Sequence, residues 1–101
     1  MKEKVTDIHS FVRYVYSTDT KHYFDNDDNR KVSVDKEENV PNSYVLRIGL
    51  KTYRLACFST YVCLFFGIRL ESRFSYEMLP LLVDHLLEGE SIDSFIKKYS
   101  L

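Results

Sequence analysis

Apolar residues dominate the last quarter of the chain. Residues 76–89 form a nearly all-round apolar stretch, which is typical of a helix buried against a sheet. Gly89 follows it, as glycine often follows a helix, and Ser91 is a good N-cap for a second helix. The pattern predicts two C-terminal helices, with Leu82 and Leu86 packed against a sheet.

The middle of the chain alternates apolar and polar residues. Residues 43–48 and 51–57 read as two strands with a turn at Gly49, because β-branched and aromatic residues alternate there with polar ones. Further strands are predicted at 21–25 and 30–36, between clusters of turn-forming residues.

Two other segments are harder to interpret. Residues 11–17 fit a strand, but residues 3–16 also fit an amphipathic helix, because their valine and isoleucine residues recur at helical spacing. Residues 60–66 are predicted as a short helix capped by Ser59 and ended by Gly67. The fold class expected is α+β: one domain over residues 1–101, with an antiparallel sheet of four or five strands packed on one face by C-terminal helices.

Composition agrees with one globular domain. Of 101 residues, 45% are hydrophobic and 15% aromatic, with only three glycines and two prolines. No apolar stretch follows the N-terminal lysines, and the longest apolar run is far shorter than the roughly 18 residues of a membrane span. We therefore expect a cytosolic protein without a membrane anchor, in which Cys57 and Cys63 are reduced, buried and inert.

Charge is segregated along a chain whose net charge is only -1. Seven acidic residues against four basic ones lie between residues 19 and 38, which suggests an acidic surface that docks on a basic patch of a partner protein, such as that of a nuclease. The candidate partner-binding residues are Asp25, Asp27, Asp28, Asp35, Glu37 and Glu38.

Residues 43–75 have the opposite balance, with five basic residues against one acidic residue. Positive charge interleaved with aromatic residues on strands is how sheets hold single-stranded nucleic acid. The candidates for this alternative are Arg47, Lys51, Tyr53, Arg54, Arg69 and Arg73. The two C-terminal helices also have the rhythm of a helix-turn-helix, although the second one offers few basic side chains.

Motifs for catalysis or cofactor binding are absent from the sequence. It has no G-x-S-x-G elbow and no glycine-rich phosphate loop, so we expect neither an enzyme nor a bound cofactor. Residues 25–29 resemble the opening of a calcium loop, but Arg30 and Lys36 occupy positions where the motif needs glycine and a carboxylate. No metal site is expected.

Three function classes therefore remain. The sequence favours a non-catalytic protein-binding module, such as an inhibitor, immunity or counter-defence protein, because it is small, has segregated charge and is rich in aromatic residues. A nucleic-acid-binding regulator that uses residues 43–75 is the alternative. A small enzyme whose site assembles only in space is the third class.

Overall fold

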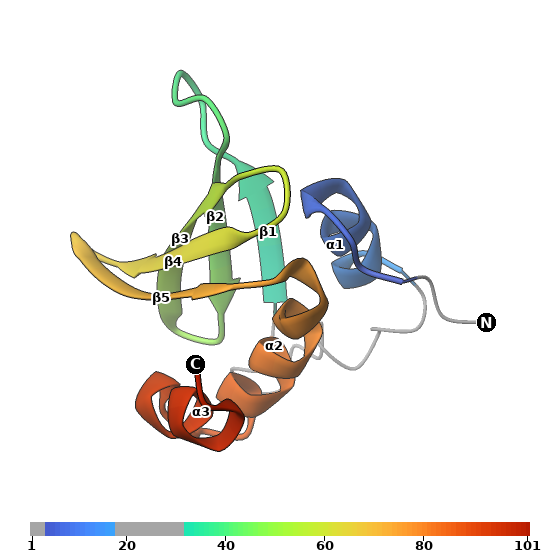
Figure 1. Cartoon of the computed structure of the whole chain (residues 1–101). Coiled ribbons are helices and arrows are strands. Elements are labelled where there is room, and N and C mark those ends of the chain that lie inside the picture. The colour runs from blue at the N-terminus through green and yellow to red at the C-terminus, as the bar shows by residue number, and fades with distance from the viewer. Residues whose placement is uncertain (1–3, 18–31) are drawn as a thin grey trace.

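A computed structural model of the chain describes residues 4–17 and 32–101, in which one helix precedes an antiparallel sheet and two more follow it (Figure 1). The elements in chain order are α1 (Ile8–Val15), β1 (Val32–Lys36), β2 (Ser43–Ile48), β3 (Lys51–Cys57), β4 (Val62–Phe66), β5 (Arg69–Phe74), the 3-10 helix η2 (Tyr76–Met78), α2 (Leu79–Leu87) and α3 (Ile92–Tyr99).

The sheet is a simple meander in which the strands lie side by side in chain order, each antiparallel to the next. Two of its connections are two-residue turns that begin with glycine, Gly49 at φ 62° and Gly67 at φ 65°. Tight hairpin turns need positive φ, which costs glycine little. These glycines therefore allow β2 to pair with β3 and β4 with β5 at close range.

One face of the sheet carries the helices. Its inward side chains alternate along each strand, and on β2 Leu46 and Ile48 are almost fully buried. The helices contribute Phe11 from α1, Leu82 from α2 and Phe95 from α3, each with no exposed surface. The α+β architecture with C-terminal helices is thus confirmed, and the sheet has five strands.

The helical interpretation of the N-terminal segment is correct, and the strand predicted at 11–17 is wrong. The side chain of Asp7 accepts a hydrogen bond from the Ser10 amide at 2.8 Å, and the Ser10 hydroxyl accepts one from the Asp7 amide at 3.1 Å. This capping box starts α1. The buried residues Phe11 and Val15 of the helix are four positions apart and so lie on one face. The strand predicted at 21–25 lies outside the described residues.

Residues 60–66 are not a helix, so that prediction is also wrong. Residues 62–66 form β4, which pairs with β3 from Val62 opposite Cys57 to Phe65 opposite Arg54. Burial alternates there, with Val62 and Leu64 inside, and Gly67 begins a hairpin turn into β5 rather than ending a helix. A short apolar run fits the period of a helix and that of a strand equally well. Pairing with β3 selected the extended form here.

The C-terminal helices confirm the prediction. The Ser91 hydroxyl accepts a hydrogen bond from the Ser94 amide at 3.1 Å and so caps α3. Gly89, at φ 87°, makes the turn between the helices. Leu82 is completely buried, whereas Leu86 is half-buried at the edge of the core. In the described part of the chain, no helix has the length and apolarity needed to cross a bilayer.

Candidate functional site

The face of the sheet that carries no helix, called the open face below, has an apolar row across four strands. Val45 on β2 stands opposite Arg54 on β3, Arg54 opposite Phe65 on β4, and Phe65 opposite Leu70 on β5. Cross-strand partners point to the same face of a sheet, so these four side chains are neighbours. Three of them are apolar, and none belongs to the buried core.

A groove of about 400 Å³ lies over the middle of this row. Its floor includes Arg54 and Phe65, and its walls come from Val40 in the β1–β2 connection, Phe58 after β3, and Ile68 at the tip of the β4–β5 turn. Apolar side chains are unusually open here: Ile68 is fully exposed, and Phe58 is 48% exposed. Clustered exposed apolar surface marks interaction sites more often than scattered single residues do.

Two of the acidic candidates, Glu37 and Asp35, are paired with bases on the open face. Glu37 accepts a hydrogen bond from Arg54 Nε at 2.9 Å and another from the Ser43 hydroxyl at 3.2 Å. An Asp35 carboxylate oxygen is 3.7 Å from Arg47 Nη1. These bridges offset negative charge on the open face, although exposed bridges contribute little to stability.

The other acidic candidates are less informative. Glu38 is exposed in the turn after β1, and no ion pair joins it to another described residue. Asp25, Asp27 and Asp28 lie outside the described residues, as does the start of the calcium-like segment. Docking through an acidic hairpin therefore stays a prediction.

The basic candidates do not gather on one surface. Arg47, Arg54 and Arg73 lie on the open face, where the Arg73 guanidinium stands 5.2 Å from the centre of the Tyr61 ring. Lys51 and Tyr53 point to the helix-bearing side, and Tyr53 is only 4% exposed.

Arg69 is the remaining basic candidate. It stands opposite Phe66, whose ring packs on Tyr53 with the centroids 5.3 Å apart, so it belongs to the helix-bearing side as well. Its Nε is 3.8 Å from a carboxylate oxygen of Glu71. A base could not stack on the buried Tyr53 ring in this arrangement.

The cysteines lie on opposite faces of the sheet. Cys57 is buried against Tyr76, and burial raises the pKa of its thiol to about 11. The Tyr76 hydroxyl donates a hydrogen bond to the Phe58 carbonyl, and its own pKa rises to about 12, mainly through burial. Cys63 is half-buried on the open face. The Cys57 thiol is therefore protonated at neutral pH and is a poor nucleophile.

A serine and a histidine do meet between the C-terminal helices. His85 Nε2 lies 2.8 Å from the Ser94 hydroxyl and 3.0 Å from the Ser91 carbonyl oxygen. A carbonyl oxygen can only accept, so a hydrogen bond between His85 and Ser91 requires the tautomer with the proton on Nε2. In that tautomer Nε2 cannot take the serine proton, and the Ser94 hydroxyl itself donates to the Ser91 carbonyl at 2.9 Å. The contact joins α2 to α3 and does not form a nucleophile–base pair.

Comparison of the chain with protein-family models, with curated proteins and with solved structures found no match. Within the described residues, no cluster of three or more histidine, cysteine, aspartate or glutamate side chains has the arrangement of a metal site.

The groove on the open face is the feature that sequence reasoning missed. The signal for it in the sequence is the excess of apolar residues at 58–70. The helix wrongly predicted at 60–66 concealed this signal.

Proposed function

We propose that the protein is a non-catalytic module that binds another protein through the open face of its sheet. The observation that carries the proposal is the groove over Phe65. It combines the Phe65 ring on its floor with exposed apolar walls, on a face that no helix of the described chain covers. An apolar centre surrounded by polar and charged groups is the usual anatomy of a protein interface.

The open face around the groove supports the same function. Arg47, Arg54, Arg73 and Tyr61 lie on or beside the open face, and arginine and tyrosine are enriched among residues that dominate binding energy. No ion pair joins Arg73 to a carboxylate of the described residues. The partner proposed is thus a protein that inserts an apolar side chain over Phe65 and places an acidic group near Arg73.

The finer interpretation is an inhibitor, immunity or counter-defence protein that acts in the cytosol, and it rests on the sequence alone. Binding by occlusion suits this chain, because the serine hydroxyl of its serine–histidine contact donates to a backbone carbonyl and its buried thiol is protonated. A nucleic-acid-binding role is less well supported. Its candidate residues are divided between the two faces, and Tyr53 has no exposed ring to offer.

Site-specific photocrosslinking in cells that naturally make the protein tests this proposal. A photoreactive phenylalanine analogue replaces Ile68, whose full exposure leaves the fold undisturbed, and the matched control carries it at the exposed Lys97 on α3. We expect a discrete protein adduct from position 68 that position 97 does not give. Identical adducts from both positions, or an adduct that nuclease removes, would contradict a protein partner on the open face.

A further inference from the structure

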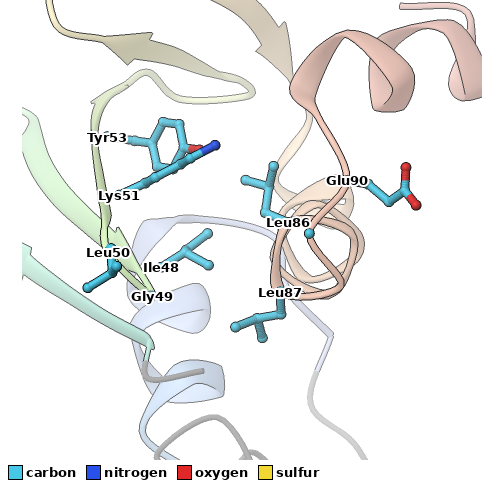
Figure 2. A pocket seen from close by; sticks show the side chains of 9 residues that line it. Ile48, Gly49, Leu50, Lys51, Tyr53, Leu86, Leu87 and Glu90 are labelled. Atoms are coloured by element: carbon cyan, nitrogen blue, oxygen red, sulfur yellow. The ribbon is translucent and has the colours of Figure 1, made fainter. Parts of the chain in front are cut away.

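A second cleft lies on the helix-bearing side of the sheet, between the β2–β3 turn and the end of α2. It encloses about 210 Å³. Figure 2 shows Ile48, Lys51 and Tyr53 on the strand side and Leu86 and Leu87 on the helix side. The cleft is separate from the groove on the open face, because the sheet lies between them.

The hydroxyl of Tyr53 is an unpartnered polar group in this cleft. The side chain is only 4% exposed, yet no hydrogen bond joins its hydroxyl to any described residue. Among the described residues, every side-chain nitrogen or oxygen that is sealed from solvent has a partner, so this hydroxyl is not sealed from solvent, and Tyr53 lines the cleft. It points from β3 toward Leu86 (Figure 2). A hydroxyl that has no protein partner and reaches solvent from a nearly buried side chain can donate to water or to a bound ligand.

Lys51 supplies a second donor. It precedes Tyr53 by two residues on β3, so both side chains point to the same side, and both line the cleft. No carboxylate of the described residues pairs with its ammonium group. Burial, reinforced by the carboxylate of Glu71, raises the pKa of the Tyr53 hydroxyl, which therefore stays protonated at neutral pH. The Lys51 ammonium group and the Tyr53 hydroxyl are thus two hydrogen-bond donors at the same cleft.

Acidic groups near the cleft leave this positive charge available. The Glu90 carboxylate points away from the cleft (Figure 2). The Glu71 carboxylate acts on the Tyr53 hydroxyl, but Arg69 Nε lies 3.8 Å from it and offsets part of its negative charge. The end of α2 carries a partial negative charge, which disfavours an anion close to the helix. A bound ligand would therefore place its anionic end at the strand side and its apolar end against Leu86 and Leu87.

We propose that this cleft binds a small monocarboxylic acid. Its carboxylate accepts hydrogen bonds from Lys51 Nζ and the Tyr53 hydroxyl, and its short apolar body lies between Ile48 and the two leucines of α2. The size favours a short ligand, since cavities for drug-sized molecules usually enclose roughly 300–1,000 Å³. The inference does not depend on the proposed protein-binding function, because the two sites share no residue.

Nuclear magnetic resonance titration of the full chain with hexanoate tests the inference. We expect saturable shifts confined to residues 48–53 and 86–90, and no saturation with hexylamine or hexanol. Tyr53→Phe and Lys51→Met should each weaken hexanoate binding about tenfold, as expected for the loss of a hydrogen bond to a charged group. Tyr44→Phe, outside the cleft, should leave it unchanged. Non-saturable shifts, equal binding of hexylamine, or unaltered affinity in both cleft variants would overturn the proposal.

Thermal unfolding of Tyr53→Phe separates a ligand role from a structural one. The variant without ligand should melt at or above the temperature of the unaltered protein, because its lost hydroxyl made no internal hydrogen bond. Hexanoate should raise the melting temperature of the unaltered protein but not that of the variant. A variant that melts at a clearly lower temperature without ligand would mean that the hydroxyl supports the fold, and the proposal would fail.

Discussion

Leu82 and Leu86 stand one helical turn apart on α2, but the structure predicts different costs for truncating them. Leu82 has no exposed surface, so Leu82→Ala leaves a closed cavity in the core, and we expect it to lower the free energy of unfolding by about 3 to 5 kcal/mol. Leu86 is half-buried and lines the open cleft, where water can fill the space left by its side chain. Leu86→Ala should therefore cost only about 1 to 2 kcal/mol.

Urea denaturation followed by circular dichroism measures both values, provided that the slopes of the transitions are equal. Leu81→Ala is the matched control, because Leu81 lies on the same helix but is 43% exposed, and its effect should stay below about 0.5 kcal/mol. A loss below about 1 kcal/mol for Leu82→Ala, or a larger loss for Leu86→Ala than for Leu82→Ala, would refute the placement of α2 against the sheet.

Three further outcomes follow from individual contacts. Cys57 should react slowly with thiol reagents at pH 8, because a thiol pKa of about 11 leaves only about a thousandth of the side chain as thiolate. The labelling rate should rise about tenfold for each pH unit. Fast labelling at pH 8 would contradict the burial of Cys57. Tyr16→Phe removes the hydroxyl that lies 3.3 Å from the carbonyl oxygen and 3.4 Å from the amide nitrogen of Val34, and should cost about 0.5 to 1.5 kcal/mol in the same urea assay; no loss would mean that this contact is not formed in solution. The hydrogen bond from the Ser10 amide lowers the pKa of Asp7, so this cap should stabilise α1 fully at pH values above the ordinary aspartate pKa. The stabilisation should be lost as the pH falls through the lowered pKa. A chemical shift of the Ser10 amide that titrates at the ordinary aspartate pKa or above it would contradict the cap.

Sequence reasoning succeeded where local signals were strong. The strands at 43–48 and 51–57 were predicted with the observed bounds, because alternation and a turn glycine act over a few residues. The C-terminal helices were predicted from their caps and apolar spacing for the same reason. Residues 60–66 failed because a short apolar run fits helix and strand alike, and the choice depends on pairing with β3.

The candidate site was harder to predict because it is assembled by register. Glu37 and Arg54 are 17 positions apart, and only the pairing of three strands brings them into contact. In the sequence they belong to an acidic and a basic segment, which suggested two separate surfaces. In the fold they form one bridge beside a groove. Segregated charge along a chain therefore does not imply segregated charge on the surface.

The most direct test of the central claim is a binding measurement. It compares how tightly the partner isolated by crosslinking binds the unaltered protein and a double variant of the open face. Ile68→Glu with Leu70→Glu places charge on two exposed positions, so the free energy of unfolding should not change. The control is Lys97→Glu with Lys98→Glu on α3, which lies on the helix-bearing side. We predict that the open-face variant binds the purified partner at least about tenfold more weakly than the unaltered protein, while the control retains its affinity. An open-face variant that folds normally and binds with unaltered affinity would contradict the account.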